Sequence, residues 1–264
     1  MALVPFPSAK PGDDEDPDRF DDDSTGKMSF LEHLDELRTR LIKIVYGLIV
    51  GCAIAYIFIQ RIFDFFMRPL AKISGGHLQY TSGAEPFMLW VKIGFLAGIF
   101  IASPWILWQV WKFIAPGLYS HEKKFAIPFV VLSTVCFISG GLFCYYVAFP
   151  WTWTFFNSFS TDYMVFVPKV DEAFSLYSKM LLGFGLMFQL PTVVFFLARM
   201  GLVTGRFLLK YFKYALLIIT IIAAVVSPGT DAMSTIIYAV PMLALYIVSI
   251  VIAFIFQKRK RAET

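Results

Sequence analysis

Residues 232–256, AMSTIIYAVPMLALYIVSIVIAFIF, contain no charged side chain. A helix of about 20 apolar residues crosses the roughly 30 Å hydrocarbon core of a bilayer, so this segment is long enough to span one. Hydrophobic residues make up 58% of the 264-residue chain and charged residues only 16%, whereas soluble domains average about 45–50% and 25%. The chain is therefore predicted to be an integral membrane protein.

Five further apolar stretches lie before this segment, and together they predict an all-α protein with six transmembrane helices. The predicted spans are residues 41–60, 87–111, 124–149, 173–198, 209–226 and 232–256. The fifth is short, because its charge-free part from Tyr214 to Thr230 has 17 residues and would reach only about 25 Å as a helix. Side-chain oxygens that can cap helix starts support the boundaries, at Ser120, Asp171, Thr204 and Thr230 or Asp231.

The distribution of basic residues predicts the orientation of the spans. The segments before span one, between spans two and three, between four and five, and after six hold 17 of the 23 Lys and Arg residues. Because cytoplasmic loops carry the Lys/Arg excess, both termini are predicted to be cytoplasmic. The outer side then has two long loops, residues 61–86 and 150–172, and a tight turn at 227–231.

Three regions follow from this pattern. Residues 1–28 form an acidic lead with eight Asp and Glu residues between positions 13 and 23, which predicts a disordered cytoplasmic segment, either an inert tail or a competitor for cationic ligands. Residues 29–256 form the six-span membrane domain, and no cleavable signal peptide is expected before it. The basic tail, residues 257–264, is expected to bind anionic lipid.

A short amphipathic helix is predicted to precede the first span at the membrane surface. Ser29 and Glu32 form a capping-box pattern. Apolar residues then recur at helical spacing on one face, at Phe30, Leu31, Leu34, Leu37 and Leu41. Prolines at positions 104, 128, 191 and 241 predict kinked spans that form a curved wall.

Enzymatic signatures are absent from the sequence. There is no Walker loop, H-E-x-x-H or G-x-S-x-G motif, and His33, His77 and His121 lie outside the spans without metal-ligand spacing. Cys52, Cys136 and Cys144 are interpreted as small hydrophobic residues. The chain is therefore expected to be neither an enzyme nor a cofactor-binding or nucleic-acid-binding protein.

Two acidic residues close to the predicted cytoplasmic face are the candidate binding residues. Glu36 lies on the surface helix, where it is either a ligand-binding carboxylate or an i, i+4 partner of Arg40. Glu122 falls in the predicted first turn of span three, where the helix dipole favours a carboxylate whatever its function.

The sequence around these residues resembles the TatC family, the multispanning receptor of the twin-arginine protein translocase. The likeness covers about residues 29–256. It rests on three separated segments: His33-Leu34-Asp35-Glu36-Leu37-Arg38; Trp111-Lys112-Phe113-Ile114-Ala115-Pro116-Gly117-Leu118-Tyr119 with His121-Glu122; and Ser227-Pro228 through Asp231 to Ala239-Val240-Pro241. The resemblance implies a cup-shaped receptor in the bacterial inner membrane. It also implies self-association, coupling to the proton-motive force, and work with the single-span TatA and TatB subunits.

The resemblance further implies the ligand and its site. The ligands would be twin-arginine signal peptides of folded passenger proteins, bound at Glu36 and Glu122, with Leu37, Arg38 and Phe113 shaping the site. The residue chemistry agrees, because a carboxylate takes a planar guanidinium through two hydrogen bonds, whereas the lysine ammonium has no such fork.

Two more polar residues are candidates for partner contacts within the membrane. Gln189 is predicted to lie mid-span, at a position where the TatC family often has glutamate. It could bind a partner helix or satisfy the backbone carbonyl freed by Pro191. Asp231 matches a family acidic residue near the outer end of span six, and N-capping explains it equally well.

Two other function classes compete with the receptor hypothesis. A small-solute secondary transporter would need charged groups or broken helices near mid-membrane, and Gln189 is the notable mid-span polar residue. An intramembrane hydrolase or acyltransferase would need a Ser or Cys beside a His at membrane depth, and the three histidines are predicted outside the spans.

Overall fold

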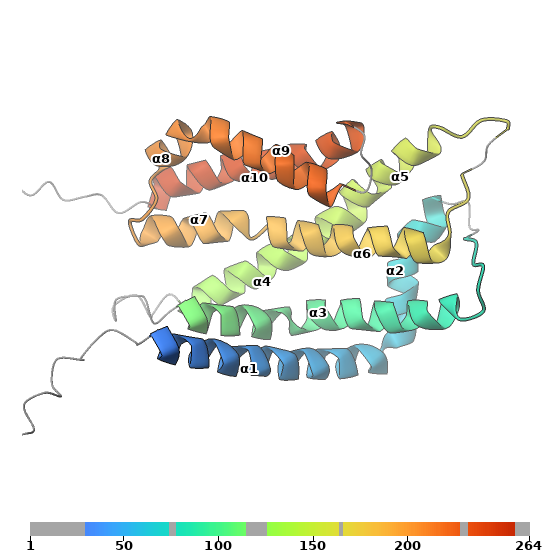
Figure 1. Ribbon diagram of the computed structural model, residues 1–264, viewed down its shortest axis with the longest axis horizontal. Helices are drawn as coiled ribbons and strands as arrows, with labels where there is room; N and C mark the ends of the chain where they lie inside the picture. The colour runs from blue at the N-terminus through green and yellow to red at the C-terminus, as the bar shows by residue number, and fades with distance from the viewer. Residues whose placement is uncertain (1–29, 74–77, 115–125, 164–165, 228–231, 257–264) are drawn as a thin grey trace, which may run out of the picture. The chain divides into compact units, whose positions relative to one another are not determined.

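The computed structural model describes residues 30–73, 78–114, 126–163, 166–227 and 232–256, and nearly all of them are helical (Figure 1). The helices are α1 Phe30–Ile57, α2 Ile59–Ile73, α3 Glu85–Ile114, α4 Ala126–Phe143, the π-helix η4 Cys144–Ala148, α5 Phe149–Asn157, α6 Val170–Met187, α7 Leu190–Arg199, α8 Gly205–Lys210, α9 Phe212–Val226 and α10 Ala232–Phe256. The chain falls into two units, residues 1–39 and 40–264. In the first unit the described part is the start of α1. The all-α prediction is confirmed.

Five helical segments among the described residues are long and apolar enough to cross a membrane. They are α1, α3, α4 with η4 and α5, α6 with α7, and α10. Helix α9, which corresponds to the predicted fifth span, is shorter: it has 15 residues and reaches only about 22 Å. The prediction of a short fifth span is confirmed. The predicted surface helix and the first span form one continuous helix, α1.

The predicted outer loop at residues 61–86 is wrong in its first half, where the structure has helix α2. Ile62, Phe66 and Leu70 follow one another one turn apart, and Phe66 and Leu70 are 8% and 0% exposed. Phe63 stacks on Trp90 of α3 with ring centroids 4.7 Å apart. The helix forms because one apolar face packs on α3 while Arg61 and Arg68 stay exposed.

The second predicted outer loop, residues 150–172, is also partly helical. Helix α5 continues to Asn157 and α6 begins at Val170. Two segments that are far apart in the sequence meet at an isolated parallel pairing of Gln79 with Lys169. There the amide of Gln79 donates to the Pro168 carbonyl (3.3 Å), and the amide of Val170 donates to the Gln79 carbonyl (2.8 Å).

Two of the predicted helix caps lie in described residues, and one of them is present in the structure. Thr204 caps α8, since its Oγ1 accepts from the amide of Phe207 at 3.2 Å, which confirms that prediction. The Asp171 cap is wrong, because the extended residue before α6 is Lys169. Asp171 lies within the first turn, and its carboxylate accepts from the Lys92 ammonium of α3.

Glycines let helices of the second unit approach closely. A Cβ at Gly140 of α4 would lie only 2.4 Å from the carbonyl oxygen of Phe184 in α6, and one at Gly51 of α1 only 2.6 Å from the Gly98 carbonyl oxygen of α3. Small residues allow membrane helices to pack at such short separations. α4 also packs against α3, and α7 against α10 (Figure 1).

The π-helix η4 interrupts the third span. Downstream of it Phe149 and Trp153 are 0% and 2% exposed, whereas Trp151 is 69% exposed. All three cysteines are free, and Cys144 in the π-turn is fully buried. A second interruption separates α6 from α7 at Phe188 and Gln189, just before Pro191. Pro104 and Pro241 lie inside α3 and α10.

Several predictions fall outside the described residues. These are the acidic lead, the Ser29 and Ser120 caps, the turn around Thr230 and Asp231, and the basic tail.

Candidate functional site

The first part of the candidate site lies at the start of α1. Glu36 is half-buried, while Leu37, at 44% exposed, and Arg38 face outward. Leu34 on the same helix is likewise 44% exposed, so this segment presents apolar side chains next to charged ones, as a helix at a membrane surface does. Whether Glu36 serves a ligand or its neighbour Arg40 stays a prediction.

The second part is the end of α3, where Phe113 is half-buried in the last turn. Two residues earlier Trp111 is 1% exposed. Its ring centroid lies 4.3 Å from that of Phe129 in α4 and 4.6 Å from that of Phe196 in α7. Edge-to-face and tilted aromatic contacts at these distances are favourable. This cluster fixes the end of α3 that carries Phe113 to two other helices.

Glu122 lies outside the described residues, and Glu36 and Phe113 belong to different units of the chain. The surroundings of Glu36 and of Phe113 are therefore described separately, each within its own unit. The pairing of Glu36 with Glu122 in one site remains a prediction.

Gln189 links two helices. Its Nε2 donates to the Ser133 carbonyl of α4 at 2.9 Å. The expectation that this amide satisfies the carbonyl freed by Pro191 is therefore wrong, because the amide turns across to the neighbouring helix. Thr192 of α7 and Ser133 of α4 are each 1% exposed, and their hydroxyls have no hydrogen-bond partner among the described residues. Asp231, the other intramembrane candidate, lies outside the described residues.

Sequence reasoning missed further polar groups within the spans. Gln109 of α3 is 2% exposed. The hydroxyls of Tyr177 and Tyr238 are buried without a partner in the described part of the chain. Buried polar groups in a membrane are costly and tend to be functional or bound to water. The available signal was an amide in an otherwise apolar stretch, Trp108-Gln109-Val110.

The described residues hold no cluster of three or more His, Cys, Asp or Glu side chains that could ligate a metal ion. In the described spans that follow α1, the buried side-chain polar atoms without a partner are one amide oxygen, one indole N–H and several hydroxyls. Such groups suit hydrogen bonding between helices or to a bound chain.

Replacing Gln189 by leucine is expected to destabilise the protein by about 0.6 kcal/mol, and at most about 1.7 kcal/mol, the range for interhelical hydrogen bonds in membranes. The cause is loss of the Nε2 donor to Ser133. Unfolding of the purified protein by sodium dodecyl sulfate in mixed micelles measures the effect. A variant as stable as the original would show that the bond contributes nothing.

Comparisons with known proteins match nearly the whole chain to one family. The family model for "Sec-independent protein translocase protein (TatC)" matches residues 32–241. A protein of that name from Koribacter versatilis is 38% identical over 253 residues, 93% of each chain. Another from Desulforapulum autotrophicum is 41% identical over 239 residues, 90% of this chain and 88% of its own.

Solved structures give the same result. A crystal structure described as the twin arginine translocase receptor TatC superposes with a TM-score of 0.73 at 35% identity, covering 84% of this chain and 98% of its own. A second, of the same receptor in the detergent DDM, has a TM-score of 0.75 at 34% identity and covers 84% and 99%.

Proposed function

Because this chain belongs to the TatC family of Sec-independent protein translocase proteins, we propose that it is the signal-peptide receptor of a twin-arginine translocase. It is a multi-pass membrane protein and a translocase component, and its family is not enzymatic. The small-solute transporter alternative gains no support, since the matched relatives are translocase proteins.

The proposal rests on one observation above the others. The family match runs from residue 32 to residue 241 and so includes the segments of Glu36 and Glu122 together with Phe113. Two carboxylates at the membrane surface each accept paired hydrogen bonds from one guanidinium. Lysines at the same two positions would offer single, strongly hydrated ammonium groups. Selection of Arg-Arg over Lys-Lys is then a consequence of hydrogen-bond geometry, with Leu37, Arg38 and Phe113 bordering the site.

The proposed setting is the bacterial inner membrane, with both termini and the signal-peptide site cytoplasmic. The basic residues concentrated in the predicted inner segments support this orientation. Single-span TatA and TatB-type subunits would be its partners, with Gln189 and Asp231 as candidate contact residues. The solved relative's description as a twin arginine translocase receptor supports the receptor role proposed above.

Glu36→Gln and Glu122→Gln are each expected to weaken binding of a twin-arginine signal peptide about 10- to 100-fold, because each removes a charged hydrogen-bond acceptor for a guanidinium. Binding of a labelled peptide to the purified full-length protein in detergent measures the change. A twin-lysine peptide should already bind this much more weakly to the unchanged protein.

Asp35→Asn is the matched control. Asp35 is an exposed carboxylate on the same helix, and its substitution removes the same charge. It should leave binding within about twofold, because consecutive residues of a helix do not face each other and Asp35 therefore points away from Glu36. Undiminished binding in both glutamate variants would refute the site assignment. Equal losses in Asp35→Asn and Glu36→Gln would show that only net charge matters.

A further inference from the structure

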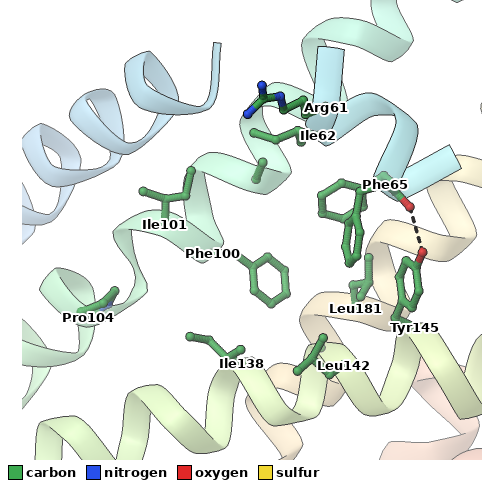
Figure 2. Close-up of a pocket in the computed structure, with 13 residues that line it drawn as sticks. Arg61, Ile62, Phe65, Phe100, Ile101, Pro104, Ile138, Leu142, Tyr145 and Leu181 are labelled. Atoms are coloured by element: carbon green, nitrogen blue, oxygen red, sulfur yellow. Dashed lines mark hydrogen bonds between the residues drawn. The ribbon is translucent and has the colours of Figure 1, made fainter. Parts of the chain in front are cut away.

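A cavity of about 550 Å³ lies between α2, α3, α4 and α6 in the second unit (Figure 2). Its floor is apolar and buried, with Phe66, Ala97 and Leu181 at 8%, 4% and 3% exposed. Its rim is also apolar but open, with Ile138 and Leu142 at 40% and 44% exposed. Because these rim residues belong to a membrane-spanning helix, the cavity opens toward the region that lipid occupies.

One charged side chain lines this cavity, that of Arg61 on α2. Figure 2 shows it at one end of the space, next to Ile62 and on the side opposite Ile138 and Leu142. No carboxylate in the described part of the chain forms an ion pair with this guanidinium. The carboxylates of Asp171 and Glu172 pair instead with Lys92 and Lys169. The Tyr145 hydroxyl, by contrast, is satisfied by the Phe65 carbonyl at 3.0 Å.

The cavity extends from Arg61 along α3. Ala97, Ile101 and Pro104 line it at successive turns, which at 1.5 Å per residue is a length of about 10 Å. One leaflet of a bilayer is about 15 Å deep in hydrocarbon. The space therefore has a cationic end and an apolar body whose length matches a large part of one acyl chain.

We propose that this cavity binds an anionic glycerophospholipid, with one acyl chain in the apolar body and the phosphate on the Arg61 guanidinium. A guanidinium binds a phosphate through two parallel hydrogen bonds. The walls supply no acidic group that would repel the headgroup.

The volume argues against a peptide in the same place. A helix with side chains is about 10–12 Å across, so 550 Å³ would hold only about one turn of a signal peptide or of a partner's transmembrane helix. An extended acyl chain is far thinner and needs no hydrogen-bond partners along its length. The proposal is independent of the signal-peptide site, which involves other residues.

Native mass spectrometry of the full-length protein, after exchange into detergent with added phosphatidylglycerol or phosphatidylcholine, tests the proposal. The unchanged protein is expected to retain phosphatidylglycerol in preference to phosphatidylcholine. Arg61→Gln should lower phosphatidylglycerol retention about tenfold and leave that of phosphatidylcholine unchanged. Arg68→Gln is the matched control, since Arg68 is an exposed arginine on the same helix that does not line the cavity, and it should retain the preference.

A second variant tests the apolar body. Ile138→Trp adds bulk at an exposed rim position and should reduce retention of both lipids, while its thermal midpoint shows that the protein is still folded. Glycerol phosphate alone should neither bind nor compete, because it lacks the chain. Equal phosphatidylglycerol retention in Arg61→Gln and Arg68→Gln would overturn the proposal. So would a photo-crosslinker at Leu142 that captures signal peptide instead of lipid.

Discussion

Trp111→Ala is expected to lower the free energy of unfolding by about 3 kcal/mol, the lower end of the range for deleting a buried aromatic side chain. Trp111 is 1% exposed and contacts Phe129 and Phe196 on two other helices. Lipid tails are as apolar as a protein core, so the loss comes mainly from packing contacts and from the space left behind. Unfolding by sodium dodecyl sulfate in mixed micelles measures it.

Trp151→Ala is the control for this prediction, because Trp151 is 69% exposed. It should change stability by no more than about 0.5 kcal/mol, as surface substitutions usually do. Trp111→Phe should lie between the two, because it keeps one aromatic ring in the cluster. If Trp111→Ala matched Trp151→Ala, the aromatic cluster would not hold the end of α3 in place.

Gly140→Ala is expected to destabilise the protein by about 1–3 kcal/mol, the usual cost of overpacking. Helix propensity alone predicts the opposite sign, because alanine is about 1 kcal/mol more favourable than glycine inside a helix. The clash decides the outcome, since the new Cβ would lie 2.4 Å from the Phe184 carbonyl oxygen and 2.9 Å from the Gly185 Cα. Backbone atoms of α6 cannot move aside without separating the helices.

Gly141→Ala is the matched control for this second prediction. It changes the next residue of the same helix, but the new Cβ would meet only the Phe100 ring, at 2.5 Å. That ring borders the cavity and has room to turn into it. Gly141→Ala should therefore be close to neutral under the same unfolding conditions. Equal losses in both variants would show that helix separation at Gly140 does not limit stability.

The spans could be predicted from the sequence because their signal is local. The run at residues 232–256 needs no knowledge of neighbours to be recognised as a membrane helix, and α10 has the same bounds. The short fifth span followed equally directly from its charge-free length. In contrast, α2 was missed because three basic residues interrupt its apolar residues, so a search for long uncharged runs passes over it. Its spacing of Ile62, Phe66 and Leu70 was the available signal.

Contacts between helices could not be predicted, because they depend on residues distant in the sequence. Asp171 has the chemistry of a cap, yet the position of Lys92, 79 residues away, decides its role. Gln189 was identified as a polar residue at membrane depth, but its acceptor on α4 could not be deduced from periodicity. For the candidate site, the residues came from family resemblance, and the structure adds the burial of Glu36 and the aromatic support behind Phe113.

The π-helix at Cys144–Ala148 changes the direction in which the side chains of the third span point beyond it. A π-turn accommodates one residue more than an α-helical turn, and one residue corresponds to a rotation of about 100°. Every side chain that follows is therefore offset around the axis, and this offset directs Phe149 and Trp153 inward and leaves Trp151 facing out. Deleting a single residue there would erase the phase change and rotate the side chains of α5 by about 100° around the helix axis, which would turn Phe149 and Trp153 away from the core without altering the composition of α5.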